Sequence, residues 1–193
     1  MQEIRLYIEK LSKENFDNFI DLRTKFIGSI GSDRTRLLDT TKINRLKDDA
    51  FSINPKYEAY LGKIGLDYVA YADFKISYST LMALPSFFLD EIFVIDNFRN
   101  LGIGMTMFDF CIRKAKKKGC GKIELAVPNQ NEKAKFFFES NGAVPIGMTY
   151  YQIDPLDIKI GKPLGKMTYA DFMRKKSKSK LARLNSLAID NIN

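Results

Sequence analysis

Apolar and polar positions alternate with two different periods along this chain. A period of two, typical of strands, occurs in residues 3–8 and 122–127, and residues 92–95 form a continuous apolar run typical of a buried strand. Further strands are expected at 57–61, 67–79, 87–95, 144–153 and roughly 164–169. Helical spacing of apolar residues occurs after Ser12, from Ser32-Asp33 to about Ala50, up to Lys118, and from Asn131 to Gly142. Ser12 and Ser32-Asp33 are suited to cap the first two helices. The order predicts an α/β (α+β) fold with no internal repeat and no linker between folding units.

A glycine-containing loop follows the strand expected at 87–95 and opens the next helix. Its residues are Arg99, Asn100, Leu101, Gly102, Ile103 and Gly104, and Met105 continues the helix. Glycines allow a sharp bend and close approach of a ligand, and the first helical amides have no partner within the helix. An anion is favoured there by about 0.3–1 kcal/mol per charge when exposed. The loop is therefore a candidate cradle for a diphosphate.

The residues after the second glycine separate this loop from two other phosphate-binding loops. A Walker A loop requires Lys followed by Ser or Thr, where this chain has Met105-Thr106. A dinucleotide-binding fingerprint requires a third small residue, where this chain has Met107. Neither pattern fits.

A second, shorter helix carries residues that support this interpretation of the loop. They are Asn131, Ala134, Phe137, Phe138, Glu139, Gly142 and Ala143. Together with Arg-x-x-Gly-x-Gly at a strand-to-helix corner, this pattern resembles the GNAT family of N-acetyltransferases over about residues 86–154. The resemblance implies a mixed, mostly antiparallel central sheet flanked by helices, in a domain covering residues 1–168. It also implies acetyl-CoA as cosubstrate.

The resemblance further implies how acetyl-CoA is held. Residues 99–105 would bind the diphosphate, and the backbone amides around Phe93 and Val94 would donate to the thioester oxygen. Asn131 would hold the pantetheine arm, although it is equally suited to cap its own helix. Ala134, three residues later, belongs to the same expected cofactor site.

One residue departs from the family pattern. Many members have Tyr where this chain has Phe138, and the Tyr hydroxyl protonates the departing thiolate. A thiol of pKa near 8.5 leaves as thiolate at pH 7 with a penalty of about 2 kcal/mol, so the loss would slow turnover without abolishing it. Phe138 can still pack against pantetheine. Tyr150 or Tyr151, on the strand expected next, is a candidate source of a replacement hydroxyl.

Two adjacent carboxylates stand beside the expected cradle. Asp90 and Glu91 begin a stretch, residues 90–94, that resembles the acid-acid-aromatic-aromatic-Val of polyamine and thialysine acetyltransferases. An ammonium of pKa near 10.4 must lose a proton before it attacks, at a cost of about 4–5 kcal/mol at pH 7, and a carboxylate assists. Because only one of two neighbours in a regular strand faces the cleft, Glu91 is the first candidate for base or amine-binding group and Asp90 the second.

Composition limits the remaining interpretations. The 193 residues carry a formal charge of +8, and the nine Lys and Arg from Lys159 onward, against two Asp, account for most of the excess. Residues 169–193 are therefore predicted to form a basic, helical C-terminal extension. The sequence lacks His and a CxxC motif, so no metal site is expected. Without a signal pattern or an apolar run of about 18 residues, it suggests a cytoplasmic protein with reduced cysteines and no membrane contact.

Three functional hypotheses follow. The first is an acetyl-CoA-dependent N-acetyltransferase that acts by direct attack of a primary amine, with a small cationic amine favoured over a protein amine. The second is a non-catalytic acyl-CoA sensor, in which Phe138 marks lost chemistry. The third is an acetyltransferase that contacts the ribosome or nucleic acid through its basic tail. Pairing of two copies into a homodimer through the last strands would be ordinary for the family.

Overall fold

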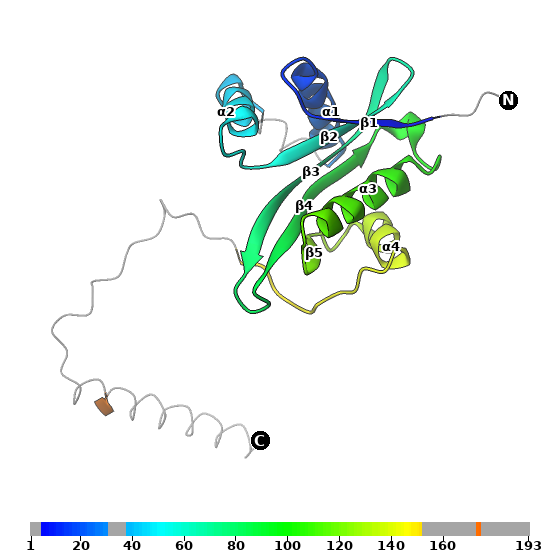
Figure 1. Ribbon diagram of the computed structural model, residues 1–193. Helices are drawn as coiled ribbons and strands as arrows, with labels where there is room; N and C mark the ends of the chain where they lie inside the picture. The colour runs from blue at the N-terminus through cyan, green and yellow to red at the C-terminus, as the bar shows by residue number, and fades with distance from the viewer. Residues whose placement is uncertain (1–4, 31–37, 152–172, 175–193) are drawn as a thin grey trace. The chain divides into compact units, whose positions relative to one another are not determined.

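One five-stranded sheet organises the computed structural model, which describes residues 5–30, 38–151 and 173–174. Its strands are β1 (Tyr7–Lys10), β2 (Glu58–Ile64), β3 (Asp67–Ser79), β4 (Leu84–Val94) and β5 (Lys122–Leu125), in chain order across the sheet (Figure 1). Neighbours from β1 to β4 are antiparallel, and β5 runs parallel to β4. The expected mixed, mostly antiparallel sheet is confirmed.

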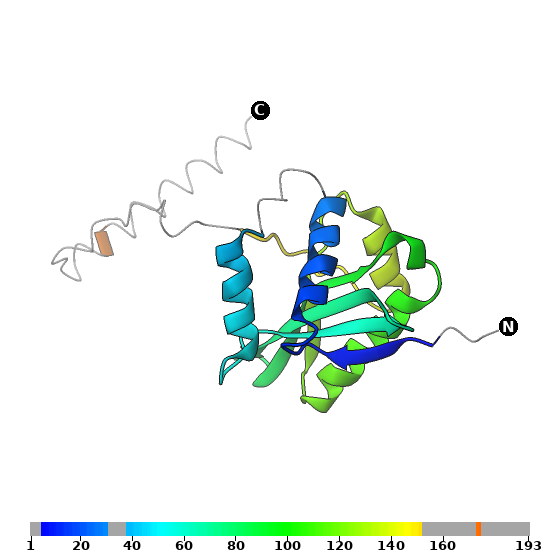
Figure 2. The same ribbon diagram turned by 90° about the horizontal axis from the view of Figure 1, so that it is seen from above.

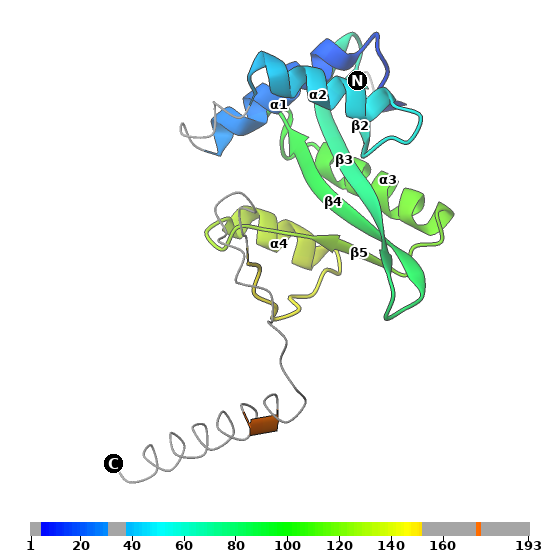
Figure 3. The ribbon, with the colours of Figure 1, turned by 90° about the vertical axis from the view of Figure 1, so that its left-hand side faces the viewer.

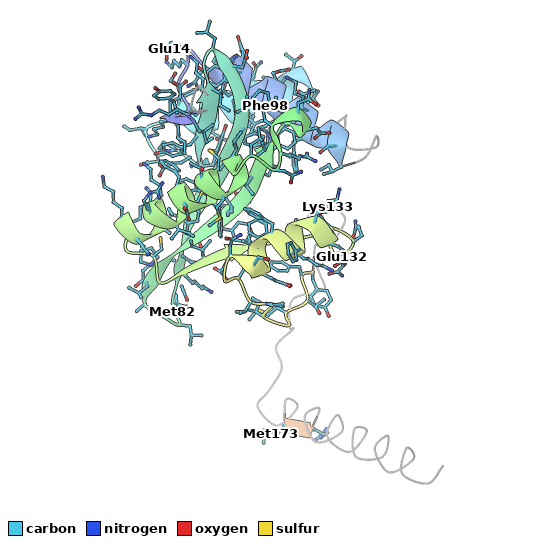
Figure 4. All side chains as sticks on the ribbon, turned by 90° about the vertical axis from the view of Figure 1, so that its right-hand side faces the viewer. Glu14, Met82, Phe98, Glu132, Lys133 and Met173 are labelled. Atoms are coloured by element: carbon cyan, nitrogen blue, oxygen red, sulfur yellow. The ribbon has the colours of Figure 1, made fainter. Side chains whose placement is uncertain are left out.

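Helices cover both faces of this sheet. α1 (Phe16–Ser29) and α2 (Thr40–Phe51) pack on one face, and α3 (Ile103–Lys117) and α4 (Glu132–Ser140) pack on the other (Figure 2). A short 3-10 helix, η2 (Asp96–Phe98), connects β4 to the loop before α3. Figure 4 labels Phe98 in η2 and Glu132 in the first turn of α4.

Each face has its own apolar core, and the helical spacing of the sequence supplies it. On the α1 face, Phe19 packs edge-on against Tyr71 of β3, with ring centroids 5.4 Å apart. On the opposite face, Met107 and Cys111 of α3 lie four residues apart and are fully buried against the sheet. Full burial of one such side chain contributes about 1.5–3 kcal/mol, so these two cores fix the helices on the sheet.

Two predicted helix starts are wrong. Ser12 does not cap α1, because a turn follows it and its own amide donates to the Asn15 side chain at 2.8 Å. α2 begins at Thr40, where Asp39 caps it by accepting from the amide of Lys42 at 2.9 Å. At the first helix, local hydrogen bonding by the Asn15 side chain thus replaces the expected Ser12 cap. Residues 32 and 33, the predicted second cap, lie outside the described residues.

The chain divides into two units, residues 1–143 and 144–193, and all the elements above belong to the first. In the second unit, described residues 144–151 form no strand, so that part of the expected strand 144–153 is wrong. The strand expected at 164–169 and the basic extension lie outside the described residues, apart from Met173 and Arg174, which are helical. Within the described ranges, no helix is long and apolar enough to cross a membrane.

Candidate active site

An extra residue in β4 determines how the two candidate carboxylates are presented. Asp73 of β3 pairs with Glu91, but the next residue, Phe74, pairs with Leu89, so Asp90 is left without an opposite residue. Such a β-bulge breaks the alternation of side chains along a strand. Asp90 and Glu91 therefore project to the same face, which is the face covered by α1.

The packing of β4 side chains before and after the bulge confirms that the alternation of faces shifts by one residue there. Before the bulge, Phe87 and Leu89 pack into the core under α3. After the bulge, Ile92 and Val94 pack there, whereas Phe93 lies in the core under α1. The prediction that only one of the two carboxylates could face the cleft is wrong, because the strand is not regular at that point.

Both carboxylates line a cavity of about 770 Å³. Its walls come from the C-terminal half of α1, from α2, from the bulge of β4 and from the segment between β5 and α4. The charged lining residues are Arg23, Lys42, Arg45, Asp49, Asp90 and Glu91. Asn131, at the end of the segment after β5, lines the same cavity as the two acids. The cavity therefore contains one residue of the expected cofactor site.

Glu91 is held by three hydrogen bonds. Arg23 of α1 donates from Nη1 to Oε2 at 2.7 Å and from Nη2 to Oε1 at 3.3 Å. The hydroxyl of Tyr71 also donates to Oε2, at 2.5 Å. These bonds fix the carboxylate and its direction, since both oxygens are engaged.

Asp90 has a more open environment. Its Oδ1 forms an ion pair with Lys75 of β3 at 2.8 Å, and its side chain is 32% exposed compared with 20% for Glu91. Water can therefore reach Asp90 more readily than Glu91. The Glu91 carboxylate is therefore held in one position by hydrogen bonds, whereas the Asp90 carboxylate is accessible to solvent.

Asp73 completes a buried charged group beneath the cavity. Its Oδ2 accepts from Nη1 of Arg23 at 3.2 Å, and burial raises the pKa of Asp73 well above its ordinary value, as does the negative charge of Glu91. Burial and the same two carboxylates also raise the pKa of Tyr71, which therefore stays protonated and remains a donor. Two carboxylates thus compete for one guanidinium.

The second half of β4 loses its neighbour on one side. β5 pairs with β4 only from Ser86 to Leu89 and ends at Leu125, so the rest of β4 pairs with β3 on one side and leaves β5 on the other (Figure 3). The amide of Ile95 donates to Val69 of β3 at 3.0 Å. Because amide directions alternate along a strand, the Val94 amide points to the opposite, unpaired side, whereas the Phe93 amide points toward β3. Of the two predicted donors, Val94 is therefore the one suitably directed.

The loop before α3 has the backbone conformation of a main-chain anion site. Asn100 and Gly102 adopt positive φ angles of 62° and 78°, and Gly102 is the N-cap of α3. Among described residues, no acceptor is recorded for the amides of Ile103, Gly104 and Met105, as expected for a first helical turn. The Ile103 side chain is buried in the core, so this residue offers only its amide.

Arg99 and Leu101 contribute differently from the glycines. The Arg99 side chain turns back on its own chain: Nε donates to the Val94 carbonyl at 3.0 Å, and Nη2 pairs with Asp96 at 2.8 Å. Its guanidinium also lies 5.7 Å from the ring centre of Phe93. Leu101 is 54% exposed. Arg99 thus ties the loop to the end of β4 in this structure.

The residues predicted on the second helix are only partly brought to the cavity. The Asn131 side chain caps α4 by accepting from the Ala134 amide at 3.1 Å. Phe138 is 7% exposed and packs edge-on against Phe108 of α3 at 5.4 Å, in the core. Phe137 lies nearer the cradle, because a Cβ on Gly104 would lie 3.8 Å from its ring.

Tyr150 belongs to the second unit of the chain, residues 144–193. Its side chain is 67% exposed, and that of Tyr151 is 87% exposed. The proposed hydroxyl role of Tyr150 stays a prediction.

Sequence reasoning missed two residues of this region, Arg23 and Asp73, and it named Phe137 as part of the helix pattern without giving it a role in the site. Arg23 and Asp73 lie 50 positions apart, and nothing in either local pattern links them. The available signal was weak: an Asp within the otherwise apolar run 69–74 of β3 is unusual for a buried strand and needs a partner. No group of His, Cys, Asp and Glu in the described residues is arranged to hold a metal ion.

Sequence comparison finds relatives among acetyltransferases. The pattern of the acetyltransferase (GNAT) family matches residues 25–143. The thialysine N-epsilon-acetyltransferase of Bos taurus is 30% identical over 118 residues, a match covering 56% of this chain and 69% of that protein. The Sus scrofa enzyme of the same name matches to the same extent.

Solved structures share the fold at lower sequence identity. The ribosomal-protein-alanine N-acetyltransferase of Brucella melitensis superimposes with a TM-score of 0.63 and 19% identity, covering 78% of this chain and 100% of that one. An aminoglycoside N-acetyltransferase in complex with CoA gives a TM-score of 0.62 and 16% identity, covering 80% of this chain and 97% of that one. These likenesses concern the arrangement of strands and helices.

Proposed function

Because this chain belongs to the GNAT family of acetyltransferases, we propose that it acetylates a primary amine on a small cationic molecule, with acetyl-CoA as the cosubstrate. The observation that carries the proposal is the cavity lined by Asp90 and Glu91 at the place where β4 separates from β5. The thialysine acetyltransferases among the relatives are consistent with an acceptor of this size and charge.

The loop before α3 would hold acetyl-CoA, which supplies the acetyl group as a thioester. The amides of Ile103, Gly104 and Met105, which have no acceptor within the described part of the chain, suit the diphosphate, since a helix N-terminus favours negative charge. Gly102 leaves the approach open, because no atom lies within 4 Å of where its Cβ would be. Phe137, beside Gly104, offers an apolar surface for the pantetheine arm.

The Val94 amide would stabilise the oxygen that becomes negative when the amine attacks. It points away from β3 on the half of β4 that β5 leaves uncovered. A backbone donor held by a sheet needs no reorganisation during the reaction, and one such donor typically contributes about 3–4 kcal/mol. The Arg99 bond to the Val94 carbonyl helps to fix the adjacent peptide, between Val94 and Ile95.

Electrostatics favour a cationic acceptor. Asp90 and Glu91 lie side by side at the bulge and line the cavity, whereas Lys42 and Arg45, which also line it, come from α2. An ammonium group that reaches the bulge can pair with either carboxylate. A neutral acceptor gains no such ion pair.

The two carboxylates suit different tasks. Glu91, clamped by Arg23 and Tyr71, is suited to bind and orient the ammonium group. Asp90, more exposed and engaged by Lys75 through one oxygen only, is suited to accept the proton through water. The neutral amine then attacks the thioester carbon, and the coenzyme leaves as its thiolate. Phe138 lies in the core and offers no hydroxyl to that thiolate.

A thiol-release assay tests the proposal. Purified protein and acetyl-CoA are incubated with spermidine, thialysine, kanamycin or a lysine-containing peptide, and free CoA thiol is measured. We expect release with spermidine or thialysine above the rate without amine. Calorimetric binding of acetyl-CoA with no release for any amine would instead support an acyl-CoA sensor. An absence of acetyl-CoA binding would refute both functions.

A further inference from the structure

Arg23 is shared between two carboxylates that face each other across β3 and β4. Asp73 and Glu91 occupy opposite positions in the strand register. Nη1 of Arg23 lies 2.7 Å from Glu91 Oε2 and 3.2 Å from Asp73 Oδ2. Glu91 and Arg23 line the cavity, and Asp73 lies below them, 6% exposed. The arginine therefore bonds more closely to the carboxylate that a ligand can reach.

The group is incompletely satisfied in this arrangement. Among the described residues, the buried side-chain atoms without a hydrogen-bond partner are Nε of Arg23 and Oδ1 of Asp73. Buried polar atoms are rarely left without partners, because the loss of their hydrogen bonds to water is then not compensated. Turning the terminal nitrogens of Arg23 from Glu91 toward Asp73 would give Oδ1 the donor that it lacks. A second arrangement of the same three side chains is thus available.

Aromatic rings hold the guanidinium in place while its hydrogen bonds change. The central carbon of the Arg23 guanidinium lies 5.5 Å from the ring centre of Phe19 and 6.0 Å from that of Tyr71. Attraction of a cation to a ring face does not depend on which hydrogen bonds the guanidinium makes in its plane. A small rotation over these rings can therefore exchange one carboxylate for the other without removing Arg23 from the site.

The geometry points to an exchange of ion pairs at Glu91. Arg23 pairs with Glu91 in the free protein, and it moves to Asp73 when the positively charged acceptor binds to Glu91. This inference rests on the proposed acetyl transfer to a cationic amine. Arg23 and Asp73 are then specificity-determining residues, since they act on the acceptor through Glu91. Tyr71 keeps its hydrogen bond to Glu91 in both arrangements.

Exchange of one cation for another explains how the site would discriminate between acceptors. Displacing Arg23 leaves Glu91 with a negative charge in a partly buried place, which is costly unless another cation replaces it. An ammonium group supplies that cation, and a neutral or anionic molecule does not. Asp73 lowers the cost on the protein side, because it receives the displaced guanidinium.

Two variants separate this exchange from a simple structural role. Asp73→Asn removes the second carboxylate, so Arg23 stays on Glu91 and the KM of the cationic acceptor should rise about tenfold, with kcat little changed. Adding Arg23→Met removes the competitor, so the double variant should recover most of the lost affinity. Both are measured with spermidine and with thialysine at saturating acetyl-CoA, and the melting temperature of each variant is recorded.

A charge-matched control comes from the same helix. Lys25 and Asp21 form an exposed ion pair at 2.6 Å, and neither lines the cavity. The double variant Lys25→Met/Asp21→Asn and the single variant Asp21→Asn should leave KM within about twofold of the unaltered protein, because exposed ion pairs contribute little.

The outcomes distinguish this inference from the function on which it rests. A KM for Arg23→Met/Asp73→Asn that is no lower than that for Asp73→Asn overturns the exchange, while turnover by the unaltered protein upholds acetyl transfer. Lack of turnover with every amine by the unaltered protein overturns both. Recovery in the double variant supports the exchange even if both variants melt at lower temperature, since a purely structural role predicts no recovery.

Discussion

Replacing Gly102 with alanine tests the main-chain cradle at the N-terminus of α3. Gly102 has a φ of +78°, where an alanine is less stable by about 1 kcal/mol because its Cβ crowds the backbone. No atom lies within 4 Å of that Cβ position, so the methyl group disturbs no packing and occupies the open space beside the helix amides. We expect a fall in melting temperature of about 2–4 °C. The Kd of acetyl-CoA should rise about threefold to thirtyfold, since a diphosphate carries two charges that each gain about 0.3–1 kcal/mol there.

Calorimetry with acetyl-CoA, beside thermal melting, measures both effects. Gly65→Ala is the matched control: Gly65 has a φ of +60° and open space around its Cβ position, but it lies in the turn between β2 and β3. Both variants should lose similar stability, and only Gly102→Ala should lose affinity. If the two variants bind acetyl-CoA equally well, the diphosphate does not rest on this corner, and the reasoning from free amides is refuted.

Further predictions concern Asp73, Tyr150 and the two cysteines. Because the pKa of Asp73 is raised in the folded protein, folding favours its protonated form, and this contribution to the free energy of unfolding is lost as pH rises above about 4. In urea unfolding from pH 4 to 8, the free energy of unfolding of the Asp73→Asn variant should lack this decrease. Identical pH profiles for the variant and the unaltered protein would contradict the prediction. If Tyr150 protonates the departing thiolate, Tyr150→Phe lowers kcat by up to about 30-fold, an effect of about 2 kcal/mol, and an unchanged rate removes Tyr150 from the mechanism. Burial raises the pKa of Cys111 to about 12, so Ellman's reagent should modify Cys120 first, and rapid loss of both thiols in the native protein would show that α3 opens.

The fold was largely predictable because its elements carry strong periodic patterns. Residues 67–79, expected as the second strand of an antiparallel pair, form β3 with those same bounds. The helix expected up to Lys118 is α3, Ile103–Lys117, and the loop before it adopts the positive φ angles that its glycine and asparagine permit. Backbone conformation of this kind depends on residues close together in the chain, so one short segment of sequence is enough to predict it.

The arrangement of the site was less predictable, because it depends on contacts between distant segments. Alternation predicts that Asp90 and Glu91 face opposite sides, and a bulge defined by pairing with β3 places them on one side. The Arg23 partner of Glu91 comes from a helix 68 positions earlier in the chain. The failed Ser12 cap has a similar cause on a smaller scale, since Asn15 supplies a competing hydrogen bond. Such choices are decided by tertiary geometry and not by residue type.

The unpaired residue in β4 also separates the number of acids from the packing of the strand during evolution. Deleting Asp90 or Glu91 would restore regular alternation, with one acid remaining between Leu89 and Ile92. Ile92 and Val94 would still pack under α3, and Phe93 would still pack under α1. A lineage could therefore lose one acid by deletion, or gain one by insertion, and keep both cores.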